Sequence, residues 1–320
     1  MKKILLFVFS VDTCFYLQGQ FSTDTSFIKY DQVIPGSTVK FAMLPIPAGT
    51  FTIGSSVKDK MKEEDEMPQH TIKLSPFWMG VHEVTFDEYK LFLNDISLSQ
   101  NIITDAVTRP SSPYIDMTLG MGKEGGYPAN SMQQYGALMY CKWLYKKTGI
   151  FFRLPTEAEW EYACRAGSTR VYPFGDDVSK LDEYAWYVNN SENKYHKVGQ
   201  KKPNAWGLYD MLGNVGEWVL DQYQVDYYTS LTDSIIDPVR RPERKHPRTV
   251  KGGAYNDGAK DLRSANRLMS DLVWNRRDPQ IPRSRWWNAD APFVGFRIAR
   301  PVKQPSAEEA ETFFQIYLGF

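Results

Sequence analysis

The chain has 320 residues, with 38 basic and 38 acidic side chains, so its formal net charge is zero. Its hydrophobic fraction of 42% is ordinary, and its aromatic fraction of 14% is high. A core of this size needs no disulfide staples. A neutral chain gives no reason to expect nucleic acid or an acidic membrane as a partner. The length fits one large domain or two small ones.

The N-terminus has the pattern of a secretory signal. Two lysines follow Met1, and the short apolar run Ile4–Val11 comes next. This run is too short to span a bilayer, which takes about 20 residues. Cleavage near Gly19 predicts a signal peptide over 1–19 and a polar linker over 20–38. Cys14 leaves a lipid anchor as an alternative, so we expect an exported protein, either periplasmic or on the cell surface.

The central part of the chain predicts short strands and two good helices. Residues 39–53 alternate as two strands, and 70–79 are strand-like. Residues 86–94 follow a capping box, 131–148 form an amphipathic helix that ends at Gly149, and 156–166 form a second capped helix. The loop-rich stretch 96–127 is of a length that usually serves function or a partner.

The last third predicts loops, short strands and a tail. Residues 219–248 are expected to be an inserted loop, whose basic run 240–248 is a solvated surface. Strands are expected over 249–251, 262–267 and 293–299. Residues 304–320 contain a capping box and an apolar end, which predict a helix that either docks on its own domain or binds a partner.

The stretch Gly207–Trp218 holds three glycines, two acids and an Asn within twelve residues. Each Gly costs about 0.5–1 kcal/mol in a regular element relative to Ala, so a compact turn is expected. The side chains of Asp210 and Glu217, with the carbonyls of Gly213 and Val215, offer the oxygen ligands that calcium prefers. The alternative is a buried turn with Glu217 in an ion pair.

This stretch resembles the signature of the formylglycine-generating enzyme family, also called the sulfatase-modifying-factor domain. The run Arg153–Gly167 is similar to the family's central helix, and Val294–Arg297 is similar to a late strand. The resemblance covers about Val39 to Pro301, and it implies one such domain over 39–303. The implied fold is α+β, an elaborated C-type-lectin-like fold with little regular secondary structure.

The resemblance implies metal sites. It supports structural calcium at Asp210, Gly213, Val215 and Glu217. In the family a further calcium site lies in the segment that corresponds to 172–196, where Asn189, Asn190 and Glu192 are the candidates here. The sulfoxide synthases of the family use iron held by a histidine triad, and this chain has four widely spaced histidines. No iron is therefore expected.

The resembled enzyme holds one copper ion with two cysteines and oxidises a substrate cysteine to formylglycine. Soft thiolates select Cu(I). Asp257 and Leu262 stand at the two cysteine positions of this chain, Ala254 replaces a serine, and Gly216 replaces a tryptophan. Copper is therefore not expected, and the catalytic cysteine pair is absent. Beyond the signal peptide, only Cys141 and Cys164 remain, and the sequence does not decide whether they pair.

The segment that corresponds to the active site of the resembled enzyme still predicts a ligand groove. Its candidate residues are Asp257, Arg263, Asn266, Arg267, Trp286, Trp287 and Asn288. Aromatic rings beside polar groups suit a peptide or a sugar, whereas the alternative places the tryptophans in the core and the charges in ion pairs. We thus expect a non-catalytic binding or scaffold protein of the cell envelope with a protein or glycan ligand. An enzyme of the sulfatase-modifying family is the alternative.

Overall fold

The computed structural model describes residues 27–95, 116–279, 281 and 283–319. The signal peptide, Cys14 and residues 96–115 of the predicted functional loop lie outside these ranges. Within these ranges, no helix is both long enough and apolar enough to cross a membrane.

The first sheet is built mostly from the N-terminal part of the chain. It is antiparallel with strand order β1-β2-β5-β10, and its strands are β1 (Tyr30–Val33), β2 (Lys40–Ile46), β5 (Phe77–Gly80) and β10 (Ala299–Pro301). The expected linker 20–38 was therefore wrong at residues 30–33, which pair with β2 and place Tyr30 opposite Met43. A four-residue edge strand is too short to show a clear period-two pattern.

Two further sheets complete the strands. The hairpin pairs β3 (Gly49–Ile53) with β4 (His70–Leu74). The third sheet has the order β8-β7-β6-β9, with β6 (Gly216–Gln222), β7 (Arg248–Lys251), β8 (Leu268–Met269) and β9 (Val294–Gly295). Only the β6–β9 pair in this sheet is parallel.

Two sequence expectations need correction in this third sheet. The expected loop 219–248 begins inside β6, where all seven residues are buried. A strand buried on both faces shows no polar alternation, so its sequence did not predict it. The expected strand 262–267 is instead the end of a 3-10 helix, Ala259–Leu262, followed by a non-repetitive segment.

Most helices follow the sequence closely, but the short helix at 181–184 was not predicted. They are α1 (Phe86–Leu93), α3 (Gln134–Thr148), α4 (Glu157–Arg165), α5 (Leu181–Tyr184) and α6 (Ala307–Leu318). The predicted capping boxes at Thr85, Thr156 and Ser306 are all formed, each with a Glu three residues later. A box of this kind satisfies two backbone N–H groups that the first helical turn leaves unpaired.

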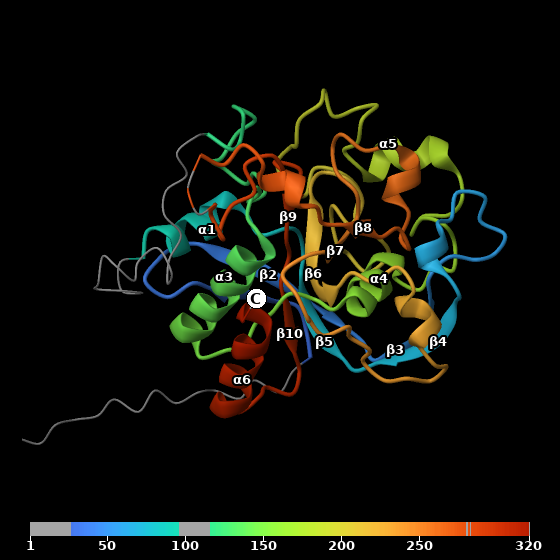
Figure 1. Ribbon diagram of the computed structural model, residues 1–320, viewed down its shortest axis with the longest axis horizontal. Helices are drawn as coiled ribbons and strands as arrows, with labels where there is room; N and C mark the ends of the chain where they lie inside the picture. Colours follow the sequence, from blue (N-terminus) through green and yellow to red (C-terminus); the bar gives the residue numbers. More distant parts are fainter. Residues whose placement is uncertain (1–26, 96–115, 280, 282, 320) are drawn as a thin grey trace, which may run out of the picture.

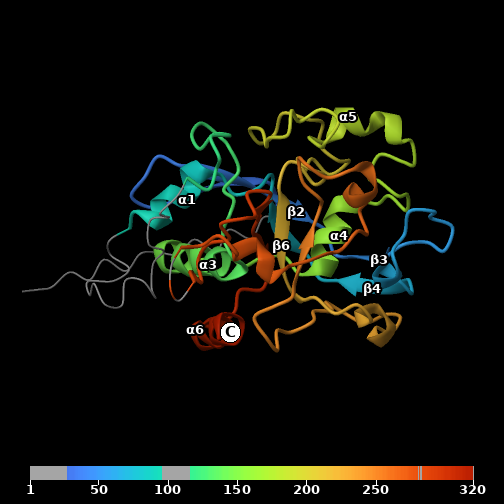
Figure 2. The same ribbon diagram turned by 45° about the horizontal axis from the view of Figure 1, so that its top comes forward.

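Two hydrophobic clusters hold these elements together. One lies around α1, α3 and α6, and the other lies around α4 and the β3–β4 hairpin. α3 and α6 lie side by side, and α4 lies beside β6 and β7 (Figure 1). α5 and α6 lie on opposite sides of the molecule (Figure 2).

Candidate functional site

The glycine-rich turn is anchored by a buried ion pair. Glu217 Oε2 accepts hydrogen bonds from Arg297 Nε at 2.6 Å and from Trp160 Nε1 at 2.7 Å, and its Oε1 accepts from Arg297 Nη2 at 2.6 Å. Both charged side chains have almost no exposed surface. Burial alone would lower the pKa of Arg297, but the charge and hydrogen bonds of Glu217 raise it. Glu217 therefore forms the ion pair that was the alternative expected from the sequence.

Asp210 lies in the same turn in a left-handed conformation, with φ of 52°. Its Oδ2 accepts from the backbone N–H of Gly199 at 2.6 Å. Glu83 lies beside it and accepts from Asn214 Nδ2 at 2.9 Å through Oε1. Asp210 Oδ1 and Glu83 Oε2 are buried and receive no hydrogen bond from a protein donor. The two buried acids are close neighbours, and this proximity disfavours ionisation of both at once.

The pKa values of both acids are raised. Burial raises the pKa of Asp210 to about 6. Burial, with the charges of Asp210 and Glu217, raises the pKa of Glu83 well above its usual range. Sequence reasoning missed Glu83, because it lies more than 120 residues before Asp210 and carries no motif signal of its own.

The calcium ligands expected from sequence are not assembled by these contacts. Glu217 has Arg297 as its counter-charge, so its oxygens are already engaged. Asp210 has one oxygen without a donor, but calcium takes six to eight oxygens. Across the described ranges, no group of three or more His, Cys, Asp or Glu side chains has the arrangement of a metal site. Calcium at these residues therefore stays a sequence prediction for solution tests.

The weaker second site is likewise used for local structure. Asn190 accepts from the N–H of Tyr187 at 3.0 Å and donates to the carbonyl of Ala185 at 2.9 Å. Asn189 donates to the Tyr187 hydroxyl at 3.3 Å. Glu192 is exposed and pairs with a neighbouring lysine. These contacts close a turn, and the second calcium site stays a sequence prediction.

The two cysteine positions of the resembled enzyme have new roles. Asp257 accepts from the N–H of Ala254 at 2.9 Å and so closes the loop after β7. Burial and then the charge of Asp261 raise its pKa to about 6. Leu262 is fully buried, and a Cβ placed at Gly253 would lie 2.8 Å from its Cδ1. Position 262 therefore fills the core and offers no lone pair to a metal.

The two arginines of the expected groove are tied into the core. Arg263 forms a two-pronged pair with Glu66, with both hydrogen bonds at 2.6 Å, and its Nη2 lies 3.4 Å from Asn266 Oδ1. Arg267 pairs with Glu157 through hydrogen bonds of 2.6 and 3.2 Å. These arginines and their glutamates are buried, so the pairs join distant segments and do not present charge to a ligand.

The tryptophans of the expected groove also belong to the core. Trp286 packs edge-on against Tyr135, with ring centroids 4.9 Å apart, and Trp287 packs against Tyr89 at 6.2 Å. The backbone N–H of Asn288 donates to the carbonyl of Ser131 at 2.7 Å. Trp287 lines a cavity of about 210 Å³. The seven predicted residues therefore do not form one groove.

Cys141 and Cys164 are both buried and free. Burial raises the pKa of the Cys141 thiol, and it raises that of Cys164 to about 12. Cys164 Sγ lies 3.6 Å from Ser264 Oγ. Because a thiolate and not a thiol binds copper or attacks a substrate, neither side chain is set up to replace the missing pair.

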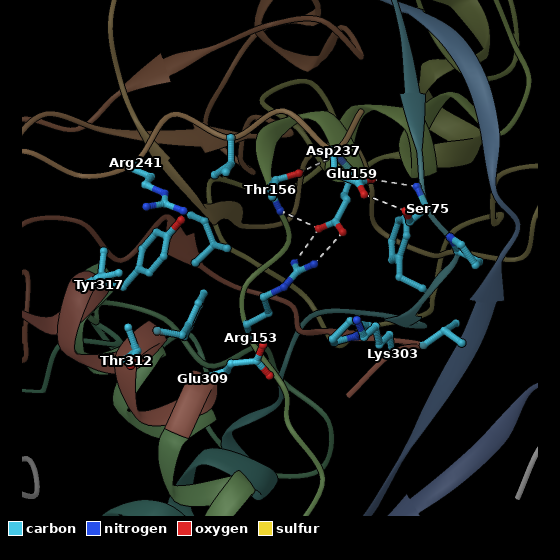
Figure 3. Close-up of a pocket in the computed structure, with 18 of the residues that line it drawn as sticks. Ser75, Arg153, Thr156, Glu159, Asp237, Arg241, Lys303, Glu309, Thr312 and Tyr317 are labelled. Carbon is cyan, nitrogen blue, oxygen red and sulfur yellow. Dashed lines mark hydrogen bonds and ion pairs between the residues drawn. The ribbon is translucent and has the colours of Figure 1, made fainter. Parts of the chain in front are cut away.

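A cavity that sequence reasoning missed lies between α6 and the body of the domain. It has a volume of about 810 Å³ and is lined by residues from β5, the start of α4, the loop at 237–241, and α6. Figure 3 shows Arg153 and Glu159 between α6 and the strand that ends near Ser75. No sequence signal predicted it, because its walls come from segments more than 200 residues apart.

The comparisons agree with this fold. Residues 34–302 match the family model of the sulfatase-modifying factor enzyme 1-like domain. The chain belongs to this family. The fold expected from the resemblance is therefore confirmed, and the family includes formylglycine-generating enzymes.

Relatives of this sulfatase-modifying-factor-like chain are diverse. It is 31% identical over 266 residues to a protein named serine/threonine-protein kinase Pkn1 from Chlamydia trachomatis, covering 82% of this chain and 38% of that protein. It is 30% identical over 255 residues to the formylglycine-generating enzyme of Bos taurus, covering 67% of this chain and 65% of the enzyme. The chain thus spans less than two thirds of the length of these relatives.

A solved structure is similar over nearly its whole length. PvdO from Pseudomonas aeruginosa superimposes with a TM-score of 0.64 and 28% sequence identity, covering 81% of this chain and 94% of PvdO.

Proposed function

We propose that this chain is an exported, non-oxidase member of the family that binds a partner in the cell envelope. The observation that carries the proposal is the set of contacts made by the residues at positions 257 and 262. Asp257 closes a loop through its bond to the Ala254 N–H, and Leu262 is buried in the core. A copper site needs two soft sulfur ligands that face one open point, and this segment supplies neither sulfur nor the opening.

The remaining features support binding over catalysis. Arg263 and Arg267 are neutralised by buried glutamates and do not face a substrate. Cys141 and Cys164 are buried thiols with raised pKa values. The binding partner is a protein or a glycan. Export rests on the pattern of the N-terminal signal, and Cys14 is the residue that a lipid anchor would use.

An enzyme with altered chemistry is the second candidate, and one observation favours it. Asp257 is half-buried, and its pKa is raised to about 6 at the position of the first copper cysteine. A carboxyl with a pKa near neutrality suits general acid–base work. This candidate would use the same segment for proton transfer in place of copper chemistry.

The decisive experiment combines copper binding with product analysis. The purified chain is titrated with Cu(I) against a chelator, and a cysteine-containing sulfatase peptide is analysed by mass spectrometry for formylglycine. We expect neither copper binding nor product. The matched variant Asp257→Cys with Leu262→Cys should bind Cu(I) if the loop still brings the two positions together. Formylglycine made by the unmodified chain would overturn the proposal.

Export is tested separately in cells. Fractionation should place the chain in the envelope, and the mature N-terminus, read by mass spectrometry, should lie near Gln20. Incorporation of labelled fatty acid that is lost in Cys14→Ser would identify the anchor. A cytoplasmic chain that retains Met1 would contradict export.

A further inference from the structure

A small pocket beside the C-terminal end of α6 is lined by four basic side chains. Lys245 and His246 come from the loop that precedes β7, Arg248 is the first residue of β7, and Arg285 comes from the segment before β9. We call this the basic pocket. The other described residues that line it are neutral, and none of them is a carboxylic acid.

Two acids act electrostatically on this cluster, but both lie outside the pocket lining. Asp221 accepts hydrogen bonds from the backbone N–H groups of Glu157 and Arg240, both at 2.7 Å. Asp271 accepts from the N–H of Val273 at 2.9 Å. The oxygens of these acids therefore serve the backbone and do not enter the pocket as counter-ions.

The basic pocket thus gathers positive charge without a matching negative group in its lining. Lys245 and Arg285 form no ion pair with any residue that the structure describes. Arg248 is only 3% exposed, although the sequence predicted a solvated surface for the run 240–248. Burial and then the charge of Arg285 lower the pKa of Lys245, and burial lowers the pKa of Arg248 to about 10. An anion would relieve this repulsion between like charges.

Arg285 is held in place by its neighbours. Its guanidinium carbon lies 3.8 Å from the centroid of the Tyr135 ring, and its Nη2 donates to the carbonyl of Leu318 at 3.4 Å. A guanidinium has five N–H donors in a fixed plane, so this one bond leaves others for a ligand. Such a planar fork is suited to bind two oxygens of one anion.

His246 is oriented by Ser270. The Ser270 hydroxyl oxygen accepts from the N–H of Arg248 at 2.8 Å, and it lies 3.1 Å from His246 Nδ1. Burial, followed by the charges of Lys245 and Arg248, lowers the pKa of His246 to about 4, so the imidazole is neutral at pH 7. With the serine proton on the Nδ1 side, the imidazole proton lies on Nε2, which can donate to a ligand.

The free space in the basic pocket admits only a small group. Its volume is about 20 Å³. A single water molecule needs about 10–15 Å³ on the same measure. A compact ionic group fits this space, whereas the body of an organic molecule has to remain outside.

We propose that the basic pocket binds a phosphate or sulfate group, carried by an ester whose organic part stays outside the pocket. Such a group offers three free oxygens to donors from the β7 loop and from Arg285, whereas a carboxylate offers two. This inference goes beyond the binding role proposed above. It depends neither on export of the chain nor on the loss of cysteine oxidation.

Calorimetric titration of the full chain at low ionic strength tests the ligand class. The probes are inorganic phosphate, inorganic sulfate, glucose 6-phosphate and glucose 6-sulfate, with glucose and acetate as controls. We expect one phosphate or sulfate group to bind per chain, and both esters to bind where glucose does not. Acetate should bind more weakly than phosphate. Added sodium chloride should weaken binding, because Lys245 is exposed and salt screens its charge.

Nuclear magnetic resonance of the histidine side chains locates the ligand. The chain has four histidines, and His246→Gln identifies the signals that belong to His246. Glucose 6-phosphate should shift the imidazole signals of His246 in the unmodified chain and leave those of the other three histidines in place. This measurement uses the unmodified chain for the binding step, so it does not depend on the folding of a variant.

Variants test the charges. Lys245→Gln with Arg285→Gln should weaken binding of glucose 6-phosphate by about tenfold, and Lys245→Gln alone by about two- to fivefold. The matched control is Arg244→Gln with Arg283→Gln. It removes the same charge from exposed positions of the same two segments, neither of which lines the pocket. This control should leave binding within about twofold of the unmodified chain.

Four outcomes would overturn the inference. The absence of saturable binding by every phosphate and sulfate probe removes the site. Binding of the inorganic ions without binding of either ester shows a free-ion site. Acetate that binds as tightly as phosphate shows a carboxylate site. Equal losses in the Lys245–Arg285 variant and in its matched control, or His246 signals that do not move, place the bound anion elsewhere on the molecule.

Discussion

Arg297 and Glu217, 80 residues apart, are joined by two hydrogen bonds of 2.6 Å in the interior of the domain. Glu217 is the second residue of β6, and Arg297 lies between β9 and β10. Arg297 also donates to the carbonyls of Gly80 at 3.2 Å and Tyr209 at 2.9 Å. One guanidinium therefore ties the first sheet, the glycine-rich turn and the third sheet together.

Removing this guanidinium should strongly lower the free energy of unfolding. Arg297→Met leaves the Glu217 carboxylate buried with Trp160 as its remaining partner, and breaking such a buried pair costs about 3–5 kcal/mol of unfolding free energy. Urea unfolding measures the loss. Adding Glu217→Gln should recover part of it, because the uncompensated charge is gone. The control is Arg170→Met, whose exposed pair with Asp176 should contribute about 0–1 kcal/mol.

The Asp210–Glu83 pair predicts a loss of stability as the pH rises. Asp210 has a pKa of about 6 in the folded chain, raised by burial, and an ordinary value near 3.8 when unfolded. The folded chain thus binds a proton that the unfolded chain has released. The stabilisation from this proton is full below the unfolded pKa and is lost as the pH rises through about 6.

Asp210→Asn tests this sign, because the amide stays neutral at every pH. The difference in melting temperature between pH 5 and pH 7.5 should be smaller in the variant than in the unmodified chain. Asp176→Asn, at an exposed position, should leave the difference unchanged. A variant that keeps the full pH difference would show that Asp210 is ionised in the folded chain already at pH 5.

Chelation tests the calcium site expected from sequence. Because Arg297 already neutralises Glu217, we expect a calcium chelator to leave the melting temperature unchanged. Elemental analysis of the purified chain, with no metal added, accompanies the scan. Near-stoichiometric calcium, together with a fall of several degrees on chelation, would restore the site at Asp210, Gly213, Val215 and Glu217.

The sequence predicted the elements whose signals are local. The helices α1 and α4 begin where Thr85 and Thr156 form capping boxes, and α3 ends at the expected Gly149. A side chain and a backbone three residues away decide these boundaries. The family was also predictable, because its motifs are long and appear in order.

The prediction of a ligand groove was wrong because the contacts of its residues depend on partners that are distant in the sequence. Arg263 and Arg267 looked like ligand-binding charges, but Glu66 and Glu157, more than 100 residues away, neutralise them. Single-sequence spacing carries no signal for such pairs. The cavity beneath α6 and the role of Glu83 were missed for the same reason, since each arises where separate segments meet.

The buried thiols predict slow chemical modification. Cys141 and Cys164 are fully buried, with raised pKa values, so a thiol reagent should react with neither in the native chain. Two thiols should appear per chain after denaturation of the protein without its signal peptide. The mass before denaturation should be the same with and without reductant. Rapid native labelling, or a reducible link between the two, would contradict the buried, unpaired state.

The C-terminal helix should contribute to the stability of the whole domain. Phe314 is 1% exposed and packs against Phe151 and Tyr145, whereas Phe313 is only partly buried. Truncating a buried Phe costs about 3–5 kcal/mol, so Phe314→Ala should lower the unfolding free energy by that amount in urea. Glu311→Ala is the control, because it removes only the exposed end of a pair with Lys142 and should cost less than about 1 kcal/mol. If α6 served only to bind a partner, Phe314→Ala would unfold α6 locally and leave the main unfolding transition unchanged. Hydrogen exchange of the α6 amides would show this local unfolding directly.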